Sequence, residues 1–440
     1  MPRILHQSDP GFANAFVELL ARKQGDLAAV EKAVGDIIAA VRSDGDEALV
    51  RLTRQFDRYK IDMDRLRVPP SELSELADRC DPKVSAALRV AADRVRRYHQ
   101  ALMPADLDYI DEVGVRLGCR WRPIDAVGIY VPGGTAAYPS SVLMNAIPAR
   151  VAGVSRVAMT VPTPDGISNP AVFAAARIAG VAEVYRIGGA QAIAALAYGT
   201  RTLAPVDKIV GPGNAYVAAA KRAVFGQVGI DSIAGPSEIA IVADAANDPT
   251  WIAADLLSQA EHDADAQAIL ISDDAAFAGA VSDAAERLLA IMDRSNIARA
   301  SWERNGAIIV VRNLSAAADL INRIAPEHLE LAVDDPETMA AQIRHAGAIF
   351  LGRWTPETLG DYVGGPNHIL PTSGAARFSS GLGVHDFLKR TSILECSVGS
   401  FAALAGPATT LARSEGLDGH ARAVELRLSH LNDGSHRHDG

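Results

Sequence analysis

Short apolar runs that end in glycine or proline and lead into alanine-rich helices constrain this chain more than any other feature. Four of these runs follow one another from about Val127, and they end near Pro132, Pro162, Gly188 and Gly211. A second set of four runs begins at Glu238. Strands that alternate with helices at this spacing are typical of βαβ units and parallel sheets. The sequence therefore predicts an α/β protein with two parallel sheets in series.

Helical patterns flank the two sets of strands. Apolar residues mark one helical face between residues 30 and 41, and after a turn at 43–45 the same spacing resumes at 46–59. A last helical segment is expected from about 400 to 430, and the polar tail at 432–440 is expected to fray. Because 440 residues exceed what one core accommodates, we expect two or more domains.

Composition limits the class of protein. With 49% hydrophobic and 22% charged residues the chain is globular, and a net charge of −10 argues against a general nucleic-acid binder. The longest charge-free stretch, residues 126–149, is interrupted by prolines and a Gly-Gly pair, so we expect no membrane helix. Three scattered cysteines do not make a disulfide framework, and no secretory signal is visible. We therefore expect a cytoplasmic protein.

One cluster of polar residues suggests half of a metal site. Gln259 and His262 stand three residues apart at the end of a predicted helix, so they point from one face. A solvated helix face is the commoner explanation of such a pair, and glutamine is an uncommon zinc ligand. Both interpretations stay open from these residues alone.

A second cluster suggests acid–base chemistry. Pro326 ends the preceding helix and leaves Glu327 and His328 adjacent in what we expect to be an exposed turn. A carboxylate beside an imidazole can supply a general base and a general acid. A charged loop without function is the alternative.

Two further segments bring more polar candidates. Asp361 and His368 lie in a stretch rich in Gly, Pro and Ser, which we expect to be a long functional loop. Glu415 and His420 lie around two glycines, so one tight turn can present both. An amide oxygen, a carboxylate and two imidazoles form a set that zinc accepts, namely Gln259, Asp361, His262 and His420. Their spacing does not show that they meet.

Dinucleotide binding is equally unproved by pattern. The motif GPGNAY at 211–216 follows a strand and opens a helix, but it lacks the third glycine of G-x-G-x-x-G. The Gly188-Gly189 turn also leads into a helix, where backbone N–H groups can bind phosphate. A close-packed turn between strand and helix explains it equally well.

Taken together and in order, the motifs resemble the histidinol dehydrogenase family over nearly the whole chain. Ten segments carry the resemblance: SDGDEAL at Ser43, VGIYVPGG at Val127, GGAQAIAALAYGT at Gly188, KIVGPGN at Lys208, AGPSEI at Ala234, SQAEHD at Ser258, APEHLEL at Ala325, GPNHILPT at Gly365, ARFSSGLGVHDFLKR at Ala376 and EGLDGHA at Glu415.

The resemblance implies a fold and a division into domains. It implies two incomplete Rossmann-like parallel-sheet domains, a helical N-terminal region and a C-terminal helical extension. The expected limits are an N-terminal segment at 1–26, a larger domain at 27–128 plus 237–382, an NAD-contacting domain at 129–236, and an extension at 383–440 that reaches a partner subunit.

The resemblance also implies an activity. L-Histidinol would be oxidised through L-histidinaldehyde to L-histidine with two NAD⁺ and one water, in the last steps of histidine biosynthesis. One zinc ion per site would be held by Gln259, His262, Asp361 and His420. Those four residues and four others match substrate-contacting positions, the others being Ser237, His328, His368 and Glu415. The positions that match NAD contacts are Tyr130, Gln191 and Asn214.

The family resemblance further implies a homodimer in which Glu415 and His420 are donated in trans, with neither nucleic acid nor membrane as a partner. For the chemistry, we expect His328 to accept the alcohol proton, because imidazole titrates near neutral pH. We expect the adjacent Glu327 to activate the water that adds to the aldehyde.

Three alternatives remain. A paralogue that oxidises another small alcohol, such as a sulfonated propanediol, would use the same scaffold, although Glu415 suits an imidazole N–H better than a sulfonate. A zinc hydrolase would use the same residue types to activate water on an amide. A metal-stabilised binding module would leave Glu327 and His328 unexplained.

Overall fold

The computed structural model describes residues 1–21, 27–133, 138–233 and 235–435. These residues belong to two units, Met1–Met103 with Ile124–Phe387 and Pro104–Pro123 with Leu388–Gly440. Both sheets predicted from the sequence lie in the first unit.

The first parallel sheet of this unit has five strands. Their spatial order is β6 (Glu183–Tyr185), β5 (Arg156–Thr160), β4 (Ala126–Tyr130), β7 (Lys208–Val210) and β8 (Gly229–Ile230). The connecting helices are α6 (Pro139–Ala152), α7 (Pro170–Ile178), α8 (Gly189–Tyr198) and α9 (Ala215–Val224). The chain runs from β4 outward to β6 and then returns to the other side of β4 with β7. In open α/β sheets, such a reversal opens a crevice at the carboxyl ends of the two central strands.

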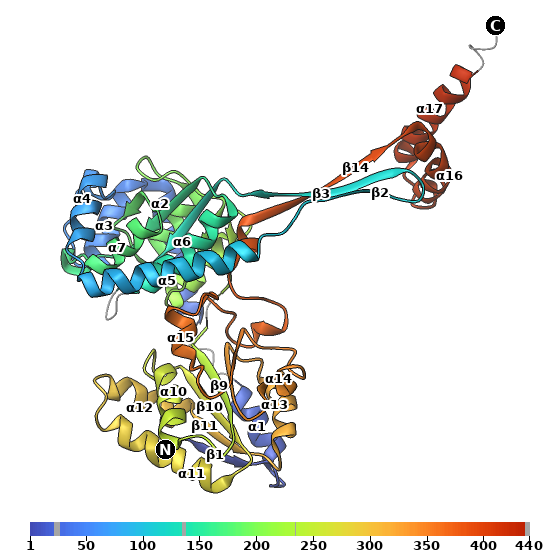
Figure 1. Cartoon of the computed structure of the whole chain (residues 1–440). Helices are drawn as coiled ribbons and strands as arrows, with labels where there is room; N and C mark the ends of the chain where they lie inside the picture. The colour runs from blue at the N-terminus through green and yellow to red at the C-terminus, as the bar shows by residue number, and fades with distance from the viewer. Residues whose placement is uncertain (22–26, 134–137, 234, 436–440) are drawn as a thin grey trace. The chain divides into compact units, whose positions relative to one another are not determined.

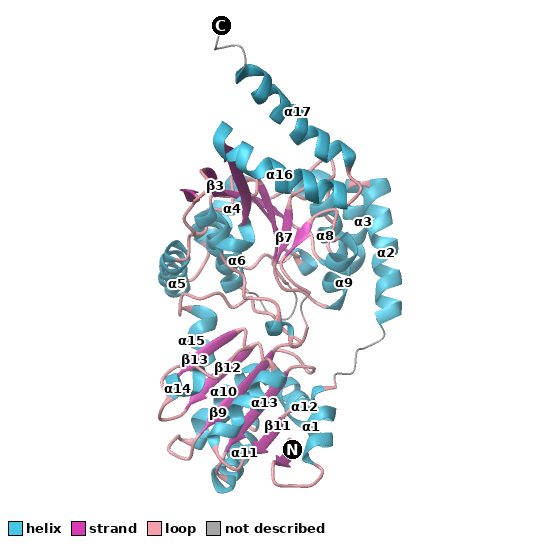
Figure 2. Cartoon of the chain, turned by 90° about the vertical axis from the view of Figure 1, so that its right-hand side faces the viewer, coloured by secondary structure: helices cyan, strands magenta, loops and turns pink. Residues whose placement is uncertain are grey.

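The second parallel sheet repeats this order and adds an edge strand from the N-terminus. It reads β1 (Arg3–His6), β11 (Ala307–Val310), β10 (Gln267–Ser272), β9 (Glu238–Ala243), β12 (His328–Ala332) and β13 (Ala348–Leu351). Figure 1 shows helices on both sides of this sheet, and Figure 2 shows its strands side by side in a row. The helices are α1 (Phe12–Leu20), α10 (Pro249–Ala260), α11 (Ala275–Leu289), α12 (Ser295–Asn305), α13 (Ala317–Ile324), α14 (Pro336–Ala340) and α15 (Glu357–Tyr362).

Alternation along the central strands explains why both faces of the second sheet are covered. In β9, Ile239 and Ile241 pack with α10, α11 and α12, whereas Ala240 and Val242 pack with α1 and α13. Trp302 of α12 is fully buried in the first of these cores. A strand that is apolar on both sides satisfies both layers, which is the pattern of a parallel sheet.

In the described part of the chain, four α-helices lie between α1 and β4: α2 (Leu27–Asp44), α3 (Asp46–Phe56), α4 (Pro70–Asp78) and α5 (Pro82–Ala101) (Figure 1). The predicted domain limits stay a prediction, but the packing of α2 and α3 differs from the expected grouping with residues 237–382. Val34, Ile38 and Leu49 share a core with Leu196 and Ile209 of the five-stranded sheet and its helices. The apolar face read from the sequence requires a partner but does not say which sheet provides it.

The second unit contains an antiparallel sheet of three strands, β14 (Leu388–Cys396), β3 (Val115–Pro123) and β2 (Leu107–Ile110). Two helices follow, α16 (Val398–Ser414) and α17 (Asp418–Ser435), which confirm the predicted C-terminal helical extension. The sequence did not reveal these strands, because most of their residues are exposed and lack the apolar alternation of a half-buried strand.

The remaining short 3₁₀ helices are η1 (Met63–Arg65), η2 (Pro164–Gly166), η3 (Leu314–Ala316), η4 (Ala375–Arg377) and η5 (Val384–Phe387). None of the helices in the described part of the chain is both long and apolar enough to cross a membrane. The predicted fraying concerns a tail whose last residues, 436–440, lie outside the described residues.

The eight strands predicted from apolar runs are confirmed as β4, β5, β6, β7, β9, β10, β11 and β13. Strand β12 was not among them. Its sequence, HLELA, contains two ionisable residues that are buried in the structure, and this polar content hid a central strand.

Candidate active site and its family

The residues that were predicted to contact NAD lie at or after the carboxyl ends of three strands of the five-stranded sheet, β4, β6 and β7. Tyr130 is the last residue of β4, and its buried hydroxyl accepts a hydrogen bond of 3.1 Å from the Gly189 N–H. Burial raises the pKa of Tyr130 to about 12. Asn214 caps α9 by accepting hydrogen bonds from the N–H groups of Tyr216 and Val217.

Gln191 lies in the first turn of α8 and is 1% exposed. Both polar atoms of its side-chain amide are buried without a hydrogen-bond partner among the described residues. A buried amide without partners is costly, so it marks a place where a ligand or a water fits.

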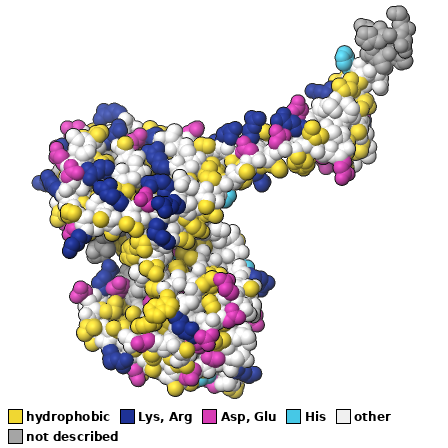
Figure 3. Space-filling view, in the orientation of Figure 1, with side chains coloured by type: hydrophobic (Ala, Val, Ile, Leu, Met, Phe, Trp, Pro, Cys, Tyr) yellow, Lys and Arg dark blue, Asp and Glu magenta, His cyan; other side chains and the backbone are white. Residues whose placement is uncertain are grey.

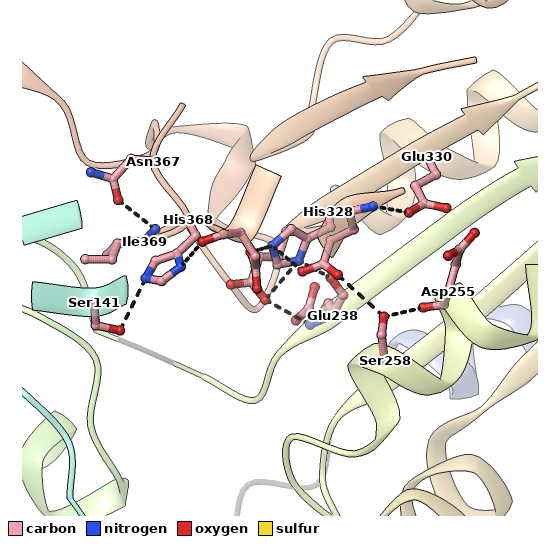
Figure 4. Close-up of polar contacts among 12 residues, drawn as sticks. Ser141, Glu238, Asp255, Ser258, His328, Glu330, Asn367, His368 and Ile369 are labelled. Atoms are coloured by element: carbon pink, nitrogen blue, oxygen red, sulfur yellow. Dashed lines mark hydrogen bonds and ion pairs between the residues drawn. The ribbon is translucent and has the colours of Figure 1, made fainter. Parts of the chain in front are cut away.

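A second polar cluster lies at the amino ends of β9 and β12. A single residue, Glu238, holds both predicted catalytic side chains. Its N–H donates to Glu327 Oε2 at 2.9 Å, and its carbonyl oxygen lies 3.0 Å from His328 Nδ1 (Figure 4). Because a carbonyl only accepts, Nδ1 carries the proton in this contact, which leaves Nε2 as the basic nitrogen of a neutral ring.

His328 Nε2 faces two carboxylates. It lies 3.6 Å from Glu357 Oε1 and 3.7 Å from Asp361 Oδ1, both on α15. Burial lowers the pKa of His328, but the charges of Glu327, Asp361 and Glu357 outweigh it and raise the pKa to about 10. His328, Glu357 and Asp361 offer ligand atoms within 4.8 Å of one another, a spacing suited to a metal ion.

The carboxylates of the cluster respond differently to burial. Burial raises the pKa of Glu327 to about 7, and burial with the nearby Asp361 raises the pKa of Glu357 to about 8. Burial also acts to raise the pKa of Asp361, but contact with His328 and the charges of His368 and His328 bring it to about 2. Several carboxyl groups thus share one buried site, and a bound cation would favour their charged forms.

Two more of the predicted zinc ligands belong to this neighbourhood. Gln259 is 1% exposed in the last turn of α10, and its Oε1 is buried without a hydrogen-bond partner among the residues described. His262 follows the end of α10; packing around its ring lowers its pKa, and the Asp361 carboxylate counters this. An unsatisfied amide oxygen, an imidazole and an ionised carboxylate fit a divalent ion of zinc type.

Behind Glu357 the carboxylates continue into the protein. The Glu357 N–H donates to Glu330 Oε1 at 2.5 Å, and Ser258 Oγ lies 3.5 Å from Glu357 Oε2 (Figure 4). Glu330 is 3% exposed, and burial together with the charge of Asp255 raises its pKa well above its ordinary value. These contacts hold α15 against β12 and α10.

His368 joins the site from the opposite side. Its Nδ1 lies 2.9 Å from the carbonyl oxygen of Asp361, and its Nε2 lies 3.2 Å from Ser141 Oγ of α6. Burial lowers the pKa of His368, although Asp361 opposes this. A cavity of about 1200 Å³ opens here, and His328, Asp361 and His368 are among its lining residues.

Three local predictions require correction. Glu327 and His328 do not lie in an exposed turn: both are buried, and His328 begins a central strand. Asp361 lies in the short helix α15 rather than in a loop, because α15 packs its acidic face on His328. Gln259 is buried, so it does not belong to a solvated helix face.

The other predicted residues fall in two places. Ser237 directly precedes β9 in the first unit, where its carbonyl oxygen accepts a hydrogen bond from Gln267 N. Glu415 and His420 belong to the second unit, at the C-cap of α16 and in the first turn of α17, and both are exposed.

Sequence reasoning missed Glu357 and the backbone of Glu238. Glu357 stands four residues before Asp361, and this spacing on one helix was a signal that would have paired them. No sequence pattern reveals which backbone carbonyl group accepts a hydrogen bond from a histidine side chain.

This geometry agrees with what comparisons with known proteins find. The family described as histidinol dehydrogenase matches residues 20–428. The chain belongs to the histidinol dehydrogenase family. A histidinol dehydrogenase of Ruegeria pomeroyi is 58% identical over 432 residues, which cover 98% of this chain and 100% of the relative. One from Rhodospirillum rubrum is 58% identical over 430 residues, 98% of this chain and 99% of the relative.

A solved structure agrees as well. The crystal structure of histidinol dehydrogenase from Elizabethkingia anophelis matches with a TM-score of 0.92 at 33% identity, covering 98% of this chain and 99% of that one. The family resemblance, the α/β fold class and the dehydrogenase class of enzyme are thereby confirmed. The roles of single residues stay predictions.

Proposed function

We propose that the protein oxidises L-histidinol through L-histidinaldehyde to L-histidine, with two NAD⁺ and one water, at a zinc-dependent site in histidine biosynthesis. The arrangement around Glu238 supports this best. The N–H and the carbonyl oxygen of this one residue hold Glu327 and His328 side by side, and the buried Nε2 of His328 has no hydrogen-bond partner among the described residues. Such a nitrogen is prepared to accept a proton from a substrate.

The proposed zinc ligands are Gln259, His262 and Asp361, with His420 of the partner subunit. The buried, unpaired Oε1 of Gln259 and the surplus of carboxylates support a cation here. When bound, zinc would hold the imidazole and amino nitrogens of histidinol and so orient the substrate. Ser237, His368 and Glu415 would complete the substrate contacts, and Tyr130, Gln191 and Asn214 would contact NAD⁺ at the crevice of the five-stranded sheet.

In the first step, His328 Nε2 takes the proton of the alcohol while a hydride leaves the same carbon for NAD⁺. The products are the aldehyde, NADH and a proton. The contact between His328 Nδ1 and the Glu238 carbonyl leaves Nε2 as the nitrogen for this transfer. The carboxylates that raise the pKa of His328 to about 10 favour the charged ring, so a bound cation that offsets them would favour the neutral ring that accepts the proton.

In the second step, water adds to the aldehyde: Glu327 takes a proton from that water, and the imidazolium of His328 formed in the first step returns its proton to the aldehyde oxygen, which gives the gem-diol and a neutral His328. His328 then accepts a proton from one hydroxyl of the gem-diol while a second hydride passes to NAD⁺. The carboxylic acid so formed loses its remaining proton to solvent and leaves the carboxylate of L-histidine. Holding Glu327 Oε2 on the Glu238 N–H would keep this carboxylate beside His328 for both transfers.

The division of labour is tested by Glu327→Gln. The glutamine keeps an oxygen for the Glu238 N–H but loses the base, so aldehyde oxidation should fall about 100-fold or more while alcohol oxidation falls less than about 10-fold. Single-turnover formation of NADH from histidinol and from histidinaldehyde measures the two steps separately.

The matched comparison is His328→Asn, which should slow both steps. Equal losses of both steps in Glu327→Gln would refute the assignment of Glu327. NADH absorbance also separates the rival functions, because a hydrolase gives no NADH. A paralogue for sulfonated alcohols would oxidise those substrates in preference to histidinol.

A homodimer with Glu415 and His420 in trans is part of this proposal. The second unit supports it with an apolar surface of its own, visible in yellow along its strands and helices (Figure 3). Its large exposed side chains include Ile110 (70% exposed), Leu394 (69%) and Leu426 (71%). Apolar side chains exposed in such numbers are typical of an interaction surface.

A further inference from the structure

The turn between β7 and α9 lies at the crevice where the chain reverses its direction across the five-stranded sheet. It runs from Gly211 to Asn214, and Asn214 is exposed at the start of α9. Gly211 has φ +115°, and a Cβ there would collide with the carbonyl oxygen of Tyr130. The turn therefore has a shape that its own sequence does not enforce, since glycine is free to adopt many others.

A buried ion pair holds the backbone of this turn in place. Asp231 Oδ2 accepts a hydrogen bond of 2.8 Å from the Gly211 N–H, and Lys221 Nζ donates to the Gly211 carbonyl oxygen at 3.0 Å. Lys221 and Asp231 also contact each other directly, and their side chains are only 2% and 5% exposed. Both polar backbone groups of Gly211 are thus held by the two halves of one ion pair.

The pair joins three elements at one point. Lys221 lies on α9 ten residues after Gly211, and Asp231 directly follows β8. The Ser232 N–H also donates to Asp231 Oδ1 at 2.6 Å. Asp231 and Ser232 line the cavity that contains His328 and Asp361, so the pair connects the turn to the wall of that cavity.

Stability alone does not account for such a pair. Burying two charges costs about as much free energy as their attraction returns, and apolar replacements of similar volume are often neutral or stabilising. Their hydrogen bonds to Gly211, however, are charge-assisted and fix a backbone position, which favours a role in defining one conformation.

We propose that Lys221 and Asp231 are positioning residues that hold the 211–214 turn in its dinucleotide-binding shape. The inference rests on the proposed function, because it takes this crevice to be the NAD⁺ site. Neither side chain needs to touch the dinucleotide. They act through Gly211 and the start of α9, where backbone N–H groups and Asn214 face the ligand.

The test is the double variant Lys221→Met with Asp231→Asn, which removes both charges and keeps an acceptor for the Gly211 N–H. The matched control is Arg156→Met with Glu183→Gln, an ion pair of 3.0 Å at the amino edge of the same sheet. Calorimetry gives the dissociation constants for NAD⁺ and for histidinol, and thermal melting shows that each variant is folded.

We expect the double variant to bind NAD⁺ about tenfold more weakly and histidinol within twofold of wild type, while the control binds both within twofold. The variant Lys221→Gln with Asp231→Asn, which restores a neutral hydrogen-bonding pair, should recover NAD⁺ binding to within threefold. A purely structural role would shift the melting temperature and leave the NAD⁺ dissociation constant of the folded protein unchanged.

If wild type binds NAD⁺ and the folded double variant binds it equally well, this inference is overturned and the proposed function stays intact. Wild-type protein that binds no NAD⁺ overturns both. Should the double variant not fold, Lys221→Met alone decides by the same criterion, because it removes the donor to the Gly211 carbonyl oxygen and keeps Asp231 on the Gly211 N–H.

Discussion

Replacing Asp57 with asparagine is expected to raise the free energy of unfolding at neutral pH. Asp57 is the C-cap of α3 and is 8% exposed, and its Oδ2 is buried without a hydrogen-bond partner among the described residues. Burial raises its pKa from 3.8 to about 6, and the charge of Arg58 only partly counters this. At neutral pH the folded protein therefore carries a buried charge that the unfolded chain leaves in water.

The sign and size follow from proton binding. Between pH 3.8 and 6 the folded carboxyl holds a proton that the unfolded one has lost, so stability falls as the pH rises through this window. A difference of two pKa units corresponds to about 3 kcal/mol, which partial solvation reduces to about 1–3 kcal/mol. Asparagine has the same shape and no charge, so Asp57→Asn removes this dependence.

Urea unfolding of wild type and Asp57→Asn at several values between pH 4 and pH 7.5 measures the effect. The variant should be more stable by about 1–3 kcal/mol at pH 7, and the difference should shrink toward zero by pH 4. The matched control is Asp165→Asn, because hydrogen bonds from Arg58 lower the pKa of Asp165 and its replacement should lose stability at neutral pH. An Asp57→Asn protein no more stable than wild type at pH 7 would refute the reasoning.

Two further predictions concern the metal and the dimer. Glu357→Gln should weaken zinc binding about 10–100-fold, because it removes one of the carboxylates that surround the site. The control Glu337→Gln changes an exposed carboxylate and should leave zinc binding unchanged. Competition with a chromogenic chelator measures the affinities, and equal affinities of the two variants would contradict the prediction. Co-expression of His262→Asn chains with His420→Asn chains should restore activity that each variant lacks alone, because a mixed dimer has one intact site; no recovery would show that His420 does not act in trans.

The sequence predicted the two parallel sheets because their signal is local. Runs such as EIAIVAD and QAILISDD are apolar on both faces, as strands covered by helices on two sides must be. The N-terminal helical face was equally clear, but its partner was not. Val34 and Leu49 pack on the five-stranded sheet rather than with the strands after 237, because a helical face specifies burial and not the neighbour that provides it.

The candidate site shows the same division. Residue types and motif order named Gln259, His262, Glu327, His328 and Asp361, and the fold places them in one neighbourhood. The interpretation of Glu327 and His328 as an exposed turn was wrong. Their strand carries polar residues that only buried partners satisfy, and those partners come from segments almost ninety residues away.

The sequence by itself determined which elements form and which family the chain resembles, since both depend on residues that are near one another along the chain. Only the tertiary structure decided that the Glu238 carbonyl contacts His328 and that Glu357 also faces His328. It also decided that Lys221 and Asp231 hydrogen-bond to the backbone of Gly211. Each of these contacts joins side chains to a particular backbone group or to each other across different elements. Their energies depend on distance and burial in three dimensions, which no spacing along the chain encodes.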